Sequence, residues 1–256
     1  MPSRERTYRT EALVLRRKDI GEADRLLTLL TPERGKLRVV AKGIRKPRSR
    51  KAGHLELFTR ASLLVAAGRD LDLITQAQAV ETYRPLREDL VRGAYAAYAV
   101  ELLDRFTPEH QEAGEVYDLL ANMLGWLCAA SDPALPARYY ELRLLALAGF
   151  QPELRRCVLG GETIVAEAQY FSVPQGGAVC ARCGRGQPGL LSISLEALKY
   201  LRYFQVQPYS RVAGLKLDPG LLAEMERVLQ RYIVYLLERQ LKSVEFLKLI
   251  RRGTAP

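Results

Sequence analysis

Residues 25–42 read RLLTLLTPERGKLRVVAK, and this stretch decides the fold of the first part of the chain. It holds two apolar runs, and Pro32 and Gly35 lie between them with the chemistry of a hairpin turn. After the turn, Lys36 and Arg38 alternate with apolar residues. Successive side chains of a strand point to opposite faces, so this alternation predicts a strand that is basic on one face and apolar on the other.

The strand pattern extends on both sides of this hairpin. Strands are predicted at residues 11–16, 25–31, 36–42, 55–65 and 71–81. A basic loop containing a proline lies between the third and the fourth. About five short strands with one long loop fit a small β-barrel of the OB type, a fold that commonly binds nucleic acid. We therefore predict an OB-fold nucleic-acid-binding domain at residues 1–82.

Beyond this domain the apolar spacing changes to three and four residues, which predicts helices. The predicted helical domain comprises residues 83–149 and 191–256, and its predicted N-caps include Ser194 and Asp218. Residues 150–190 break the helical rhythm, are rich in Gly and Pro, and contain three cysteines. The predicted fold class is α+β and multidomain: an N-terminal OB-fold β-barrel, then an all-α domain that carries a zinc-ribbon-like insertion.

The net charge of +10 is concentrated at one end of the sequence. Residues 1–60 hold 17 Lys and Arg against 7 Asp and Glu, so the remaining chain is electrically neutral. The densest part, Arg34 to Lys51, has nine basic residues and no acidic one. We predict that these nine bind nucleic acid: Arg34, Lys36, Arg38, Lys42, Arg45, Lys46, Arg48, Arg50 and Lys51.

Nine like charges in one segment repel each other, and a phosphate backbone relieves that repulsion while releasing counterions. The segment has no aromatic residue, which favours sequence-tolerant contacts to phosphates over base stacking. The plainer alternative is a solvated basic loop. If the segment binds nucleic acid, reversing the charge of Lys36, Arg38, Lys42 and Arg45 should weaken nucleic-acid binding and leave the fold intact.

Composition argues against several other classes. No apolar run approaches the roughly 18 residues of a spanning helix, and Met1–Arg6 is not followed by the apolar core of a secretory signal. We therefore expect a cytoplasmic protein that does not enter a membrane. The sequence contains no phosphate-binding P-loop, no GxGxxG, no HExxH, and only two histidines, so we predict no enzymatic activity.

The cysteines of the insertion suggest metal chemistry. Cys180 and Cys183 form a Cys-x-x-Cys knuckle, and Cys157 begins a second knuckle in which Gly160 holds the place of the other ligand. Three interpretations stay open: a structural zinc site with a distant or solvent fourth ligand, a degenerate ribbon that folds without metal, and a redox pair. Cys128, in an apolar helical run, is interpreted as a core thiol.

The order of these parts resembles the bacterial RecO family of DNA repair and recombination mediators. The matching stretches are Gly21–Arg25, Leu29–Gly35, Ala41–Gly43 with Arg48–Arg50, Leu55–Phe58, Ala79–Thr82, Tyr140–Leu142 with Gly149–Pro152, and Cys157 with Cys180–Cys183. The resemblance spans nearly the whole chain. It implies an OB fold, a helical domain and a zinc-ribbon-like insertion, for which the family pattern has four cysteines. Gly160 departs from that pattern.

The resemblance also implies binding to single- and double-stranded DNA and annealing of complementary strands. The implied partners are RecR and the single-stranded-DNA-binding protein, with which the family helps to load the RecA recombinase at gaps. The implied location is cytoplasmic and nucleoid-associated.

Two other classes stay open from the residues alone. The first is an RNA-binding OB-fold protein, because charge does not separate DNA from RNA. The second is a metal-dependent nuclease that uses the cysteines or the pair Glu22 and Asp24, although an ordinary turn explains that pair as well. A second DNA surface could also include Arg182, Arg185, Lys199 and Arg202.

Overall fold

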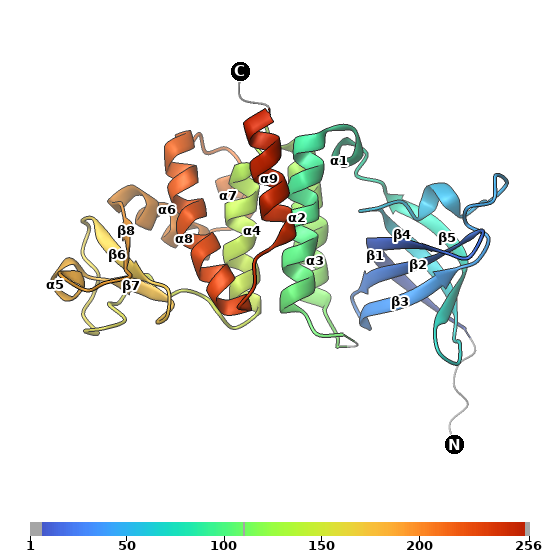
Figure 1. The fold of residues 1–256 in the computed structure, drawn as a ribbon, viewed down its shortest axis with the longest axis horizontal. Helices are drawn as coiled ribbons and strands as arrows, with labels where there is room; N and C mark the ends of the chain where they lie inside the picture. The colour runs from blue at the N-terminus through green and yellow to red at the C-terminus, as the bar shows by residue number, and fades with distance from the viewer. Residues whose placement is uncertain (1–6, 110, 254–256) are drawn as a thin grey trace. The chain divides into compact units, whose positions relative to one another are not determined.

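The computed structural model describes residues 7–109 and 111–253 (Figure 1). Residues 1–6, which bear on the predicted absence of a secretory signal, lie outside the described part. The chain divides between Cys128 and Ala129 into two compact units. Among the described residues, the first contains a β-barrel, a short 3-10 helix and three α-helices, and the second contains the remaining α-helices and a small sheet.

Five strands form the barrel, in the sheet order β1-β2-β3-β5-β4, and β4 pairs back with β1. Their bounds are β1 Thr7–Ile20, β2 Asp24–Thr31, β3 Gly35–Ala41, β4 Arg60–Ala66 and β5 Asp72–Glu81. All these pairings are antiparallel except that of β3 with β5. This arrangement is that of an OB-type barrel, and it confirms the predicted fold class.

The β2–β3 hairpin forms where the sequence predicts it. Thr31 pairs with Gly35 across the turn, and Gly35 has a φ of +60°, a left-handed conformation that glycine adopts without strain. Leu37 and Val39 point into the barrel core as expected. A side chain at position 35 would also collide with the backbone oxygen of Gln111, so glycine is required there for two reasons.

The prediction of a strand from residue 55 is wrong, because β4 begins only at Arg60. Leu55 follows the short 3-10 helix Ala52–His54 and packs into the barrel core from the loop. Phe58 has a φ of +67°, and its N–H donates to the carbonyl of Val14. A residue in the left-handed region interrupts the extended backbone, so the alternation at residues 55–59 does not produce a strand.

Three helices complete the first unit: α1 Pro85–Glu88, α2 Leu90–Phe106 and α3 Gly114–Ala129. Asp89 caps α2 by accepting hydrogen bonds from the N–H groups of Val91 and Arg92. The hydroxyl of Tyr117 in α3 donates to Glu11 of β1 over 2.7 Å, which ties this helix to the barrel.

The helices of the second unit are α4 Ala134–Leu147, α5 Ala181–Gly184, α6 Leu195–Val206, α7 Tyr209–Val212, α8 Pro219–Leu237 and α9 Lys242–Gly253. Both predicted N-caps are confirmed: Ser194 accepts from the N–H of Ala197, and Asp218 accepts from those of Gly220 and Leu221. Helix α9 was not predicted from the sequence.

A buried ionic network joins three helices of this unit. The guanidinium of Arg138 in α4 lies 2.7 Å from the carboxylate of Glu141 and 3.1 Å from that of Glu226 in α8. Arg251 in α9 pairs with Glu226 at 2.9 Å. Arg138 and Glu141 are both almost completely buried, so their charges depend on each other for compensation.

The cysteine-rich segment forms a sheet in the order β7-β6-β8. The strands are β6 Gln169–Ser172, β7 Gly177–Val179 and β8 Leu191–Ile193, and the short helix α5 lies beside them (Figure 1). Since β8 begins at residue 191, the sheet extends just past the predicted end of the insertion. The domain boundaries 1–82, 83–149 with 191–256, and 150–190 stay predictions.

Candidate functional site

The basic loop between β3 and β4 is anchored at its start to the β1–β2 turn. A carboxylate oxygen of Asp24 accepts a 2.7 Å hydrogen bond from the N–H of Gly43, and the N–H of Arg45 donates to the carbonyl of Ala23 over 2.9 Å. Between these two contacts, the side chain of Ile44 is buried in the barrel core. The loop therefore has a fixed entry point on the barrel surface.

The far end of the loop is held by Lys51. Its ammonium donates to the carbonyl of Ile74 in β5 over 3.0 Å, and the side chain is half-buried. Burial lowers the pKa of this lysine, although the charge of Asp24 opposes that shift. Lys51 was predicted to contact nucleic acid, and its ammonium is instead engaged with the barrel.

Seven of the nine predicted basic residues are exposed: Arg34, Arg38, Lys42, Arg45, Lys46, Arg48 and Arg50. Five of them lie on the anchored loop or at its start, and Arg34 and Arg38 lie on the β2–β3 hairpin. The guanidinium of Arg34 sits over the ring of Tyr8, 4.0 Å from its centroid. The loop therefore gathers positive charge from a continuous stretch of chain.

Lys36 was expected to contact nucleic acid, but its side chain is buried in the structure. It is only 7% exposed, and its ammonium donates to the carboxylate of Asp104 over 3.1 Å and to the Asp104 carbonyl over 2.9 Å. Asp104 lies in the α2 helix. We therefore remove Lys36 from the proposed nucleic-acid contacts and assign it to the contact between the barrel and α2.

This assignment predicts that substitution of Lys36 lowers stability but not DNA binding, and that substitution of Arg38 weakens DNA binding but not stability. Lys36→Ala is expected to lower the free energy of unfolding by about 2 kcal/mol, because it removes a buried ammonium that donates to both the carboxylate and the carbonyl of Asp104. Its DNA-binding salt slope should match that of the unmodified protein. Arg38→Ala should leave stability unchanged and reduce the slope by about 1. Denaturant titration and salt-dependent anisotropy measure both quantities, and equal losses of slope would contradict the assignment.

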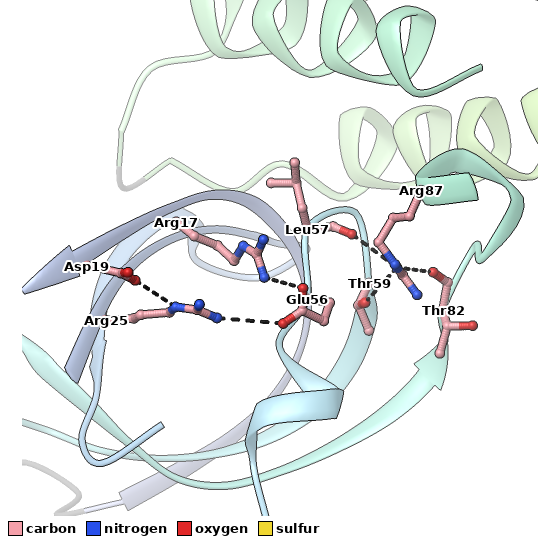
Figure 2. Close-up of polar contacts among 8 residues, drawn as sticks. All are labelled: Arg17, Asp19, Arg25, Glu56, Leu57, Thr59, Thr82 and Arg87. Atoms are coloured by element: carbon pink, nitrogen blue, oxygen red, sulfur yellow. Dashed lines mark hydrogen bonds and ion pairs between the residues drawn. The ribbon is translucent and has the colours of Figure 1, made fainter. Parts of the chain in front are cut away.

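Basic side chains of β1 and β2 adjoin the loop, and the sequence interpretation missed them. Figure 2 shows Arg17 of β1 and Arg25 of β2 reaching toward Glu56. Arg25 also pairs with Asp19 at 2.8 Å, and Arg45 of the loop reaches the same Asp19 at 3.3 Å. The sequence feature that could have indicated the basic side chains of β1 is the run of three basic residues from Arg16 to Lys18, all of which are exposed.

A second cluster in Figure 2 fixes the end of the loop region. Arg87 of α1 donates to the carbonyls of Leu57 and Thr82, over 3.2 and 2.6 Å, and lies 3.5 Å from the hydroxyl of Thr59. One guanidinium thus connects the segment before β4 with the end of β5.

The pair Glu22 and Asp24 has a structural explanation in the turn. Asp24 is engaged in anchoring Gly43, and Glu22 is exposed. Across residues 7–109 and 111–253, the one group of His, Cys, Asp and Glu that could hold a metal ion lies in the second unit. The predicted alternative of a metal site at Glu22 and Asp24 therefore has no support in the described part of the barrel.

The metal-site group consists of Cys157, Glu162, Cys180 and Cys183, whose ligand atoms all lie within 4.8 Å of one another. The three cysteines are those predicted from the sequence, and the structure brings them together. Glu162 was missed, although it lies only two residues after Gly160, the position of the missing cysteine. Three sulfurs and one carboxylate are donors that suit zinc, which accepts Cys and Glu ligands.

Backbone geometry prepares Cys157 to act as a thiolate. Burial alone raises the pKa of this thiol, but the N–H groups of Cys180, Gly160 and Leu159 donate to its sulfur and bring the pKa down to about 7. In contrast, a hydrogen bond with Cys180 raises the pKa of Cys183. A bound cation would stabilise all three sulfurs as thiolates.

Of the residues suggested for a second DNA surface, two contact other groups of the protein and two are exposed. Arg202 is half-buried and donates to the carbonyl of Leu154 over 2.8 and 2.6 Å, and Arg182 pairs with Glu162. Arg185 and Lys199 are exposed.

Cys128, which was interpreted as a core thiol, is half-buried in α3, and burial raises the pKa of its thiol.

The described helices include none that is both long and apolar enough to cross a membrane.

The structure defines an OB-fold protein with a basic loop, a helical second part and a cysteine-rich module whose side chains could hold a metal ion. Two family models match in succession: "Recombination protein O N terminal" over residues 5–83 and "Recombination protein O C terminal" over residues 87–245. The chain therefore belongs to the RecO family, as its sequence motifs predict.

Individual relatives agree with this assignment over almost their whole length. A protein named DNA repair protein RecO from a Roseiflexus species is 43% identical over 249 residues, which cover 97% of this chain and 88% of the relative. Relatives with the same name from Symbiobacterium thermophilum and Dehalococcoides mccartyi are 39% and 35% identical. The matches cover 95% of this chain in both cases, and 98% and 96% of those relatives.

Proposed function

We propose that this protein is a DNA-binding mediator of recombination repair. In this proposal it binds single- and double-stranded DNA through the barrel, anneals complementary strands, and helps RecR to load the RecA recombinase. The observation that carries the proposal is the anchored basic loop of an OB-type barrel in a member of the RecO family. Its exposed charges are arranged on a rigid base, which suits contact with phosphates.

Annealing needs no nucleotide hydrolysis, because base pairing between the strands supplies the free energy. The barrier is electrostatic, since two phosphate backbones must approach each other. A surface rich in Arg and Lys lowers that barrier by screening the phosphates and holding both strands close together. We propose this non-catalytic role for Arg34, Arg38, Lys42, Arg45, Lys46, Arg48 and Arg50, with Arg17 and Lys18 as additional contacts.

The rest of the chain has a different charge balance, which suits other tasks. Residues 61–256 have no net charge, and we propose that they offer surfaces to RecR and to the single-stranded-DNA-binding protein. We propose zinc as the metal of the cysteine module, where it would act as a structural cross-link. We also propose a cytoplasmic, nucleoid-associated location, where the protein would meet DNA.

Salt-dependent fluorescence anisotropy with labelled DNA tests the proposal. We expect binding to both single strands and duplexes, with an affinity that falls linearly with salt on a logarithmic plot. Unlabelled DNA and RNA of matched sequence then compete for the protein, and preferential displacement by RNA would favour an RNA-binding function instead. Incubating DNA with the protein and Mn²⁺ is the control for nuclease activity, and cleavage would contradict a purely non-catalytic role.

The anchor at Asp24 predicts a result that simple electrostatics does not. Asp24→Ala removes a negative charge next to the loop, which by charge alone should strengthen DNA binding. We expect binding to weaken by about tenfold, because the loop loses its fixed entry point and must be ordered when DNA binds. Glu22→Ala is the matched control, since it makes the same charge change at an exposed neighbour. Tighter binding by Asp24→Ala would contradict a role for loop rigidity.

A further inference from the structure

The two knuckles of the cysteine module share two backbone contacts although only one knuckle has two cysteines. In the complete knuckle, the N–H of Cys183 donates to the sulfur of Cys180 over 3.4 Å, and the N–H of Gly184 donates to the Cys180 carbonyl over 2.9 Å. The first knuckle repeats both contacts. Position 160 is therefore the structural equivalent of Cys183.

In the first knuckle, the N–H of Gly160 donates to the sulfur of Cys157 over 3.4 Å, and the N–H of Gly161 donates to the Cys157 carbonyl over 2.8 Å. These are the same two contacts at the same separations along the chain. The turn that presents metal ligands is thus intact, and only the side chain at position 160 is missing.

The carboxylate of Glu162 fills the space of that missing side chain. A Cβ atom built on Gly160 would lie 2.2 Å from Oε2 of Glu162 and 2.8 Å from the sulfur of Cys183. The same Oε2 lies 3.9 Å from the Cys183 sulfur. A carboxylate and a side chain at position 160 cannot both occupy this place, so the glycine and the glutamate are complementary.

We propose that Glu162 is the fourth metal ligand of this chain and replaces the missing thiolate at position 160. The proposal rests on metal binding by the module, as proposed above. One carboxylate oxygen of Glu162 lies within 4.8 Å of all three sulfurs, and Oε1 pairs with the guanidinium of Arg182. Arg182 thus orients the carboxylate from outside the site, as outer-shell partners of metal ligands do. Together the three sulfurs and this carboxylate would supply the four ligands that a structural zinc ion takes.

Zinc and cobalt titrations of the metal-free, reduced, full-length protein test this proposal. A chromophoric chelator competes for zinc and gives the affinity, and the visible spectrum of bound Co²⁺ reports the ligand set. The unmodified protein should bind one ion with a tetrahedral cobalt spectrum. Glu162→Ala should weaken zinc binding by at least about tenfold to a hundredfold, which is the range for loss of outer-shell partners alone. Its cobalt spectrum should shift as water replaces the carboxylate.

Two further variants make the result specific. The double substitution Gly160→Cys with Glu162→Ala should regain tight binding and show stronger sulfur-to-cobalt charge transfer, because it has four thiolates. Glu167→Ala, an exposed acidic change in the same segment, should bind metal like the unmodified protein. If Glu162→Ala keeps the affinity and spectrum of the unmodified protein, Glu162 is not a ligand, while the metal site stands. If the unmodified protein binds no metal, both proposals fall.

Discussion

Reversing the charge of Lys46, Arg48 and Arg50 to glutamate is expected to lower the affinity for duplex DNA at 0.1 M salt by on the order of a hundredfold or more. The slope of log K against log salt should fall by about 3, since each lost phosphate contact removes about 0.9. All three side chains are exposed between the two anchors of the loop, at Asp24 and Lys51. The barrel core does not contain them, so thermal unfolding should be unchanged.

A control of equal charge separates a local contact from the effect of net charge. Arg211, Lys216 and Arg239 are exposed in the second unit, and reversing all three changes the net charge by the same amount. We expect this control to bind DNA nearly as the unmodified protein does. If both triple variants lose affinity and slope equally, the loop has no special role, and the positive charge acts only through the general field of the molecule.

Arg138→Ala is expected to destabilise the protein by about 3–5 kcal/mol, the usual consequence of removing one partner from a buried ion pair. The substitution leaves the carboxylate of Glu141 without its arginine in the interior, and it also breaks the contact with Glu226 of α8. Thermal and denaturant unfolding of the full chain measure the loss.

Two comparisons test the cause of this destabilisation. Arg84→Ala breaks the exposed pair with Glu88 and should change stability little. The double substitution Arg138→Met with Glu141→Leu should recover much of the stability, because both buried charges are removed together. A double variant as unstable as Arg138→Ala would show that lost packing, not an uncompensated charge, dominates.

Features set by neighbouring residues were predictable from the sequence. The β2–β3 hairpin depends on a turn and a local alternation, and the caps at Ser194 and Asp218 depend on contacts two or three residues away. Two departures from the sequence-based expectations in the barrel come from distant partners. Lys36 is buried by an aspartate 68 positions later, and the N–H of Phe58 is bound by a strand far earlier in the chain.

In the candidate sites too, local features were predictable from the sequence and contacts between distant residues were not. Exposed charge on the basic loop was readable from composition, because a run of nine basic residues cannot all be buried. The anchoring role of Asp24 required the contact with Gly43, 19 residues away, and a pair of acidic residues alone does not indicate it. Glu162 was close in sequence to the missing cysteine, but only the folded knuckle shows that its carboxylate fills that space.

The most direct test of the account is a strand-annealing assay with complementary DNA oligonucleotides and no ATP. We predict that the unmodified protein accelerates annealing above the spontaneous rate, that added ATP makes no difference, and that the variant reversed at Lys46, Arg48 and Arg50 loses most of the acceleration. The control reversed at Arg211, Lys216 and Arg239 should retain it. A protein that saturates both strands and still leaves the annealing rate at its spontaneous value would contradict the account.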